Sequence, residues 1–234
     1  MGMGQRLHKK APGARAVFVR RGIYSPHPPH PHASVAALRI YMGVMAWYSL
    51  GSMSTPQPNE LSLEAMEQLW EEHVKCEFST CNVDDTMATM TSTPYVNHVP
   101  VLTGGVGREA VREFYSRHFI PKMPPDTQTT LVSRTVGRDQ IVDEMIFKFT
   151  HTIEMDWMLP GVAPTGKSVA VPLVAIVHFQ DGKVSHEHIY WDQASVLVQL
   201  GLLDPAMLPV AGRETARKVE DPDSEPSNEL INMV

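Results

Sequence analysis

The residues best suited to chemistry lie in one run, Asp181 to Leu203, which reads DGKVSHEHIYWDQASVLVQLGLL. Asp181-Gly182 separates two β-prone runs and predicts a tight hairpin turn, so we expect a strand to follow it. Side chains on a strand alternate between its two faces. One face then carries two imidazoles, a phenol and a carboxylate: His186, His188, Tyr190 and Asp192. Such a row could bind a polar substrate and transfer a proton.

Asp192 ends this strand and comes directly before a short predicted helix, Gln193 to Leu200. A carboxylate buried in an apolar pocket has a raised pKa and can act as a general base, with His188 beside it to orient it or carry its proton. An Asp directly before a helix is also a preferred N-cap, where its side chain accepts backbone hydrogen bonds. Both interpretations stay open at this point.

His151 is a second candidate, because it falls on the apolar face of a predicted long strand, Ile141 to Glu154. There it could stabilise charge that develops on a substrate carbonyl, or it could be a hydrogen-bonded histidine of the core. The aromatic side chains of Phe149 and Trp157 are typical of a pocket wall. We therefore expect both aromatic residues to contact a substrate.

A metal site is a lesser alternative. His186 and His188 form an HxH pair on one strand face, a spacing that lets two imidazoles reach one ion, and His178 or His151 could supply a third ligand. No carboxylate stands at an obvious ligand spacing. We therefore expect neither a metal nor a cofactor.

Length and charge bound the possible functions. The 234 residues, 43% of them apolar, fit one ordinary domain with extra segments. Residues 1–59 carry seven basic and no acidic side chains, and residues 60–210 carry ten basic and twenty acidic ones. A body this acidic disfavours binding to nucleic acid.

The first 59 residues are rich in Pro, His and Arg and lack a periodic apolar pattern, so we expect a disordered leader. A basic leader without acidic residues resembles a mitochondrial transit peptide, but it could also be an extension upstream of Met53. Cys76 and Cys81 fit neither a CxxC pair nor a disulfide framework, which favours a reducing compartment. We expect a cytoplasmic protein, with the mitochondrion as the alternative.

Membrane insertion is not expected. The longest apolar run, Ile40 to Leu50, is too short to span a bilayer, and extending it back to Ala33 brings Arg39 into it. The sequence therefore predicts no membrane span.

Periodicity predicts the order of the elements. Apolar residues recur at helical spacing over Leu61–Ser79, Val83–Thr91 and Arg108–Phe119, and a short strand is expected between the last two, at Thr93–Val101. From Thr127 the period changes to two, which predicts three strands before the hairpin turn and one after it: Thr129–Val136, Ile141–Glu154, Lys167–Phe179 and the strand that ends at Asp192. Residues 60–210 are expected to form one domain, and residues 211–234 a charged, disordered tail.

Three segments resemble a known family. GREAVREFY at Gly107–Tyr115, the FQDGKVSHEHIYWD run at Phe179–Asp192 and the stretch Phe149–Lys167 are similar to SnoaL-like polyketide cyclases of the nuclear transport factor 2-like superfamily. The resemblance implies an α+β fold, a cone-shaped curved antiparallel sheet wrapped on three N-terminal helices, with a short C-terminal helix. It covers about Leu61 to Leu203.

The resemblance also implies a pocket inside the cone. In these cyclases an aspartate on the last long strand acts as general base, and Asp192 would match it. A polar residue on the first strand is usual, and Asn97 or His98 stands there, while Tyr115 and Tyr190 would complete the substrate site. We expect cofactor-independent cyclisation or isomerisation of a small apolar carbonyl compound by a homodimer. A non-catalytic binding or dimerisation module of the same fold is the alternative.

Overall fold

The computed structural model describes residues 61–233, and the predicted leader lies outside them. Helix α2 (Leu63–Phe78) begins at Ser62, whose side chain accepts a hydrogen bond from the backbone N–H of Ala65 at 3.1 Å. Its buried face follows helical spacing through Met66, Trp70 and His73 to Cys76 and Glu77. Two ionisable side chains, His73 and Glu77, therefore enter the interior together with the apolar ones.

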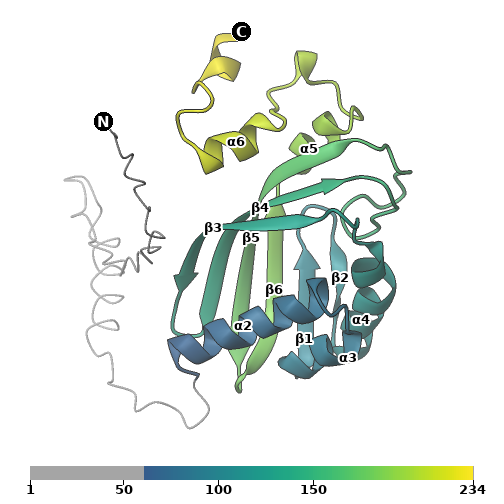
Figure 1. Ribbon diagram of the computed structural model, residues 1–234, viewed down its shortest axis with the longest axis vertical. Helices are drawn as coiled ribbons and strands as arrows, with labels where there is room; N and C mark the ends of the chain where they lie inside the picture. Colours follow the sequence, from purple (N-terminus) through teal and green to yellow (C-terminus); the bar gives the residue numbers. More distant parts are fainter. Residues whose placement is uncertain (1–60, 234) are drawn as a thin grey trace, which may run out of the picture. The chain divides into compact units, whose positions relative to one another are not determined.

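Six strands of the described chain form one curved sheet (Figure 1) in the order β2-β1-β6-β5-β4-β3. Their bounds are Met90–His98 (β1), Thr103–Val106 (β2), Gln128–Val136 (β3), Gln140–Thr150 (β4), Ser168–Gln180 (β5) and Lys183–Trp191 (β6). Strands β3 to β6 form the predicted antiparallel meander, and β1 pairs with β6 in parallel. The α+β fold with a curved sheet and a short C-terminal helix is confirmed.

Two further α-helices lie between α2 and β3 in the described chain. Helix α3 (Val83–Thr89) begins at Asn82, whose side chain accepts hydrogen bonds from the backbone of Asp84 and Asp85. Helix α4 (Arg108–Glu113) continues directly into a π-helix, η1 (Phe114–Phe119), and a short 3-10 turn, η2 (Ile120–Lys122). Helix α2 crosses one face of the sheet, and α3 and α4 lie beside β1 and β2 (Figure 1). No helix in the described part of the chain is long and apolar enough to cross a membrane.

The connection between β4 and β5 is partly buried. Strand β4 ends at Thr150 rather than Glu154, and four side chains of the following loop are buried: Met155, Trp157, Met158 and Leu159. These side chains belong to the main hydrophobic core, where together they remove a large apolar area from water.

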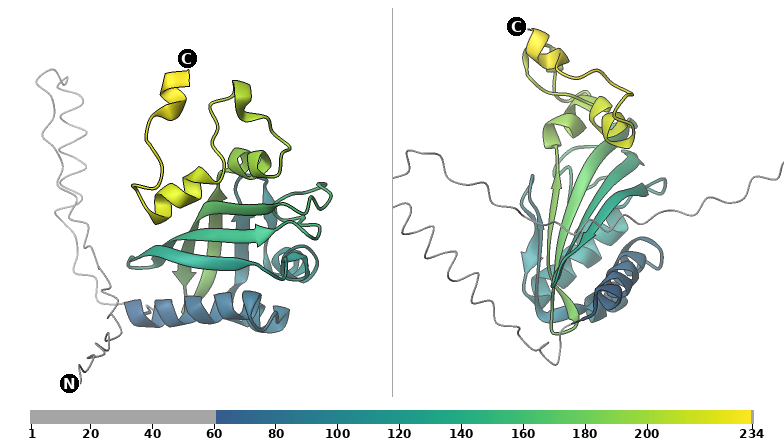
Figure 2. Two further views of the ribbon diagram at one scale, coloured as in Figure 1. Left: turned by 45° about the horizontal axis from the view of Figure 1, so that its top comes forward. Right: turned by 90° about the vertical axis from the view of Figure 1, so that its left-hand side faces the viewer.

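The C-terminal region also differs from the prediction. Helix α5 (Gln193–Gln199) follows β6, and after a 3-10 turn (Pro205–Met207) helix α6 (Glu214–Glu220) lies within the segment expected to be a disordered tail. A last 3-10 turn, η4, covers Glu229–Met233. Helix α6 orders because Ala216 packs with Ile146 and Ala170 of the sheet, and Lys148 pairs with Glu220 at 2.6 Å. Figure 2 places α5 and α6 at the end of the sheet opposite α2.

Gly104 in strand β2 makes a close approach that predicts a mutational effect. Gly104 pairs with Asn97 across β1 and β2 at a φ of 136°, and a Cβ there would lie 2.0 Å from the carbonyl oxygen of Val96. We expect Gly104→Ala to lower the free energy of unfolding by more than about 3 kcal/mol, because backbone must move. Urea denaturation measures the change.

Gly161→Ala is the matched control. Gly161 also has a positive φ, 75°, but no atom lies within 4 Å of an added Cβ. Its substitution should cost only about 1 kcal/mol. Equal losses in the two variants would contradict the close approach.

Candidate active site

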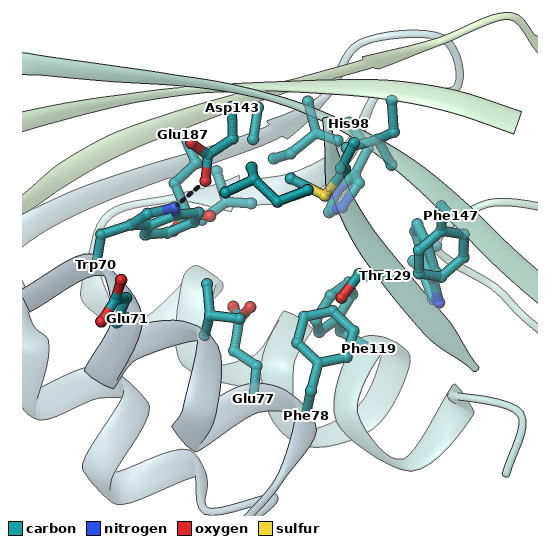
Figure 3. Close-up of a pocket in the computed structure, with 18 of the residues that line it drawn as sticks. Trp70, Glu71, Glu77, Phe78, His98, Phe119, Thr129, Asp143, Phe147 and Glu187 are labelled. Carbon is teal, nitrogen blue, oxygen red and sulfur yellow. Dashed lines mark hydrogen bonds between the residues drawn. The ribbon is translucent and has the colours of Figure 1, made fainter. Parts of the chain in front are cut away.

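A cavity of about 220 Å³ lies between α2 and the inner face of the sheet. Its wall is mostly apolar and aromatic, with side chains from α2, η1 and strands β1 and β3 to β6. Figure 3 shows Trp70, Phe78, Phe119 and Phe147 around the open space. Glu71, Thr129 and Leu131 are its exposed lining residues, so the cavity opens to solvent between α2 and β3.

A buried polar cluster forms one part of this wall. The Nε2 atom of His73 lies 3.1 Å from Oε1 of Glu77 and 3.2 Å from Oε1 of Glu187. The hydroxyl of Tyr115 donates to Oε1 of Glu187 at 3.1 Å and lies 3.3 Å from His73 Nε2. Glu77, Glu187 and Tyr115 all line the cavity. In Figure 3 the carboxylate of Glu77 points into the open space.

Three elements bring the cluster together. His73 and Glu77 stand four residues apart on α2 and so share one helix face. Glu187 comes from the middle of β6. Tyr115 lies in the π-helix η1, where Phe114, Tyr115 and Phe119 are all buried. Single π-helical turns inside α-helices are frequent at functional sites, and this one places Tyr115 against the cluster.

Thr89 determines which nitrogen of His73 carries a hydrogen. Its hydroxyl donates to the carbonyl oxygen of Thr86 at 2.6 Å, so its oxygen must accept from Nδ1 of His73, which also lies 2.6 Å away. Nδ1 is therefore protonated, and Nε2 faces the two carboxylates. A second proton on Nε2 makes the ring an imidazolium that both carboxylates stabilise.

The cluster separates the pKa values of its members. Burial lowers the pKa of His73, but the charges of Glu77 and Glu187 outweigh it and raise this pKa from 6.5 to about 10. Burial raises the pKa of Glu77 above its ordinary value. Burial also opposes the charge of Glu187, but the His73 charge and the hydrogen bonds from His73 and Tyr115 lower its pKa. The pKa values of the two carboxyl groups are thus shifted in opposite directions from the ordinary glutamate value.

A second ion pair closes the cavity wall. Asp143 on β4 accepts hydrogen bonds from Arg134 Nε at 2.7 Å, from Arg134 Nη2 at 2.8 Å and from the Trp70 indole at 2.8 Å. Arg134 also pairs with Glu71 of α2 at 3.3 Å. The fork geometry of the guanidinium matches the Asp143 carboxylate, and these contacts fix α2 against the sheet beside the opening.

His98 contributes a neutral imidazole. The residue is buried among the rings of Phe114, Phe119, Trp157 and Trp191, at centroid distances of 5.1 to 5.8 Å. Burial lowers its pKa from 6.5 to about 4, and the charge of Glu187 and a backbone hydrogen bond at Thr103 only partly oppose this. His98 is therefore uncharged at neutral pH, in contrast to His73.

The structure brings some of the predicted site residues together. Three of them line the cavity: His98, Tyr115 and Trp157. His151 and Phe149 are buried, as expected for the inner face of β4 and the loop after it, but neither lines the cavity. Nδ1 of His151 instead accepts from the backbone N–H of Thr165 at 3.3 Å.

The assignment of faces on β6 needs correction. The inner face carries Glu187, Ile189 and Trp191, so His188 and Tyr190 lie on the outer face. Asn97 also lies on the outer face, beside His188, because His98 points inward from β1. The expectation that these residues face the cavity is wrong, because alternation defines two faces without indicating which one is buried.

Asp192 is the N-cap of α5. Its Oδ1 accepts hydrogen bonds from the backbone N–H groups of Ala194 at 2.9 Å and Ser195 at 3.2 Å, and the residue is exposed. Of the two interpretations of Asp192, general base or helix N-cap, the structure shows the N-cap. Asp192 does not line the cavity, so it is not the base there.

The sequence contains a signal for Glu187. Glu187 shares its strand face with Ile189 and Trp191, and two large apolar neighbours indicate the buried side. His73 and Glu77 follow the same helical spacing as Trp70, which indicates that they share its buried face. Thr89 and the link between α2 and β6 carry no local signal.

The cluster could in principle hold a cation. Among the described residues, His73, Glu77 and Glu187 form a group whose three donor atoms all lie within 4.8 Å of one another. A proton on Nε2, shared between the two oxygen atoms, satisfies the same atoms at 3.1 and 3.2 Å, within the ordinary range of N–H···O hydrogen bonds. The contacts of the cluster therefore need no ion to explain them.

Comparisons with known proteins agree with this architecture. The family model for SnoaL-like polyketide cyclase matches residues 61–200. The structure of TsrD from Streptomyces laurentii superposes with a TM-score of 0.50 at 22% identity, covering 62% of this chain and 100% of TsrD. At this identity the likeness shows the fold alone.

Two other solved structures are similar at lower TM-scores. A candidate SnoaL-like polyketide cyclase from Jannaschia sp. CCS1 has a TM-score of 0.48 at 22% identity, with 64% of this chain and 99% of that chain covered. A protein with a ketosteroid isomerase-like fold from Catenulispora acidiphila has a TM-score of 0.46 at 15% identity, with 58% and 94% covered. No curated protein matches the sequence.

The opposed histidine pKa values predict how stability depends on pH. Between pH 6.5 and about 10 the folded chain keeps a proton on His73 that the unfolded chain releases, so the free energy of unfolding should fall as pH rises. Between pH 6.5 and about 4 the unfolded chain binds a proton that His98 refuses, so stability should also fall as pH drops. Urea denaturation from pH 4 to 10 should find a maximum near pH 6.5.

A variant tests whether His73 causes the predicted fall in stability above pH 6.5. His73→Gln should remove most of the decline above pH 6.5, a loss of a few kcal/mol in the unmodified protein. His118→Gln, at an exposed histidine that pairs with Asp156, should leave the decline unchanged. Stability that rises between pH 7 and 9 in the unmodified protein would contradict a charged His73.

Proposed function

Because the chain belongs to the SnoaL-like polyketide cyclase family, we propose that its cavity binds a small, mostly apolar carbonyl compound and catalyses proton transfer on it. The observation that carries this proposal is the pair of buried carboxyl groups at the cavity wall, Glu77 and Glu187, which both contact Nε2 of His73, at 3.1 and 3.2 Å. Burial raises the pKa of Glu77, whereas His73 and Tyr115 lower that of Glu187 against the effect of burial. Two such groups at one cavity are suited to acid and base roles at the same pH.

Glu187 is the proposed base. At neutral pH it is an anion held by the His73 imidazolium and by the Tyr115 hydroxyl, and it lines the cavity. It takes the proton from a carbon next to the substrate carbonyl, and the electrons of that C–H bond form an enolate. Glu187 stands on the last long strand, the element that carries the base in the resembling cyclases.

Glu77 is the proposed acid. Its raised pKa keeps a proton on the carboxyl group at higher pH than an ordinary glutamate, and its carboxyl group points into the cavity. It donates this proton to the enolate oxygen and so gives an enol. Return of a proton to another carbon would complete an isomerisation, and attack of the enol carbon on a second carbonyl would complete a cyclisation.

The walls set the kind of substrate. The apolar and aromatic lining favours a hydrophobic ring system, and the low dielectric of the site strengthens each electrostatic contact inside it. His98, neutral because of its burial, adds no charge to this part of the wall. A small uncharged ketone is therefore the proposed class of substrate.

A non-catalytic binding module is the second candidate. It is favoured by one observation, namely that His73, Glu77, Glu187 and Tyr115 already hydrogen-bond to one another and would form a satisfied polar core without a substrate. The two functions differ in whether a bound ketone exchanges its protons.

Proton exchange into a probe ketone tests the proposal. We expect the protein to accelerate exchange of the α-protons of 2-tetralone in D₂O, measured by proton NMR. Glu187→Gln should reduce the accelerated rate by at least about a hundredfold and Glu77→Gln by about tenfold or more, since each removes one proton-transfer group.

Asp192→Asn is the matched control, because Asn also caps helices well and Asp192 lies outside the cavity. It should keep the exchange rate of the unmodified protein. Binding of 2-tetralone without any accelerated exchange would favour the binding module, and loss of exchange in Asp192→Asn alone would contradict the assignment of Glu187.

A further inference from the structure

The outer face of the sheet carries three adjacent histidines that the proposed reaction does not use. His178 on β5 is the direct cross-strand partner of His186 on β6, and His188 follows two residues later on the same face. The ring centroids of His178 and His186 are 4.8 Å apart, and those of His186 and His188 are 5.1 Å apart. We call these three residues the histidine row.

The spacing of the row matches metal ligation. An imidazole nitrogen binds Zn²⁺ at about 2.0–2.1 Å, and the ring centre lies about 1 Å farther out, so two rings on one tetrahedral ion have centres about 5 Å apart. Both neighbouring pairs of the row already have this separation. The rings of His178 and His186 are nearly parallel, at 10°, and must rotate about their terminal side-chain torsions, which are broad.

Hydrogen bonds prepare His178 as a ligand. The hydroxyl of Ser185 donates to the carbonyl oxygen of His178 at 3.1 Å, so its oxygen accepts from Nδ1 of His178 at 2.7 Å. Nε2 of His178 is then left with a lone pair. A hydrogen bond on the far nitrogen is the usual device that fixes the tautomer and orientation of a metal-binding histidine.

A carboxylate lies beside that lone pair. Oδ2 of Asp139 is 3.5 Å from Nε2 of His178, a separation suited to two ligands of one ion. The turn that carries Asp139 is held in place, because the backbone N–H of Phe179 donates to the Asp139 carbonyl oxygen at 2.8 Å. Three imidazoles and one carboxylate from two strands and a turn would complete a four-coordinate set.

We propose that His178, His186, His188 and Asp139 bind one divalent transition-metal ion of the zinc class, which joins β5, β6 and the β3–β4 turn. Neutral imidazoles are the form in which histidines bind such an ion. With four protein ligands the site is closed, so the ion stabilises the fold rather than taking part in the reaction.

Thermal unfolding of the full, chelator-treated chain with added ZnCl₂ tests this proposal. An ion that binds the folded state raises the melting temperature by mass action. Zinc should raise it in the unmodified protein, isothermal titration should give a site of one equivalent, and His186→Gln or His188→Gln should weaken that site at least tenfold. His118→Gln should bind zinc as the unmodified protein does.

The same measurements separate the rival sites. His8, His27, His30 and His32 stand outside the described residues and are unchanged in every variant, so the difference between variants reports on the row. If zinc gives no thermal stabilisation, or gives the same stabilisation in His186→Gln and His188→Gln, the proposal is wrong. It is also wrong if Glu77→Gln abolishes the stabilisation, because the ion then binds the cluster inside the cavity.

Discussion

A buried imidazolium, that of His73, held between the side chains of Glu77 and Glu187 is the interaction on which the interior of this protein depends. Taking Glu77 and Glu187 out of water is costly unless a positive charge and good hydrogen bonds compensate, and His73 supplies both at 3.1 and 3.2 Å. Because His73 and Glu77 belong to α2 and Glu187 to β6, this compensation also fixes the helix against the sheet. Removing His73, or removing the glutamates that pair with it, would leave an uncompensated charge inside the protein.

The same constraint produces the chemistry. Burial raises the pKa of Glu77, and the charge of Glu187 adds to this rise. Burial also opposes the charge of Glu187, but the His73 charge and the hydrogen bonds from His73 and Tyr115 lower its pKa. Two carboxyl groups of one residue type then acquire opposite roles at a shared cavity. Asp143 is paired with Arg134 beside the opening. Glu77 and Glu187 are therefore the carboxyl groups of the cavity wall that we propose transfer protons.

Much of the fold could be predicted from the sequence, because periodicity reports burial. The change from helical to alternating spacing after Thr127 gave the meander, and the Asp181-Gly182 turn placed β6 correctly. Alternation alone does not show which face of β6 is buried. The titratable side chains around His188, which we expected inside the cone, lie on the outer face of the sheet. The cluster itself depends on contacts between residues up to 114 positions apart in the sequence, His73 and Glu187, which no local pattern records.

Carboxyl ¹³C NMR of protein labelled at the glutamate side chains tests the opposed titration of the two groups most directly. With Glu77→Gln and Glu187→Gln used to assign the two resonances, the account predicts that at neutral pH Glu187 is ionised and titrates below the ordinary glutamate range, while Glu77 titrates above that range. Two resonances that titrate together at the ordinary value of an exposed glutamate would contradict it.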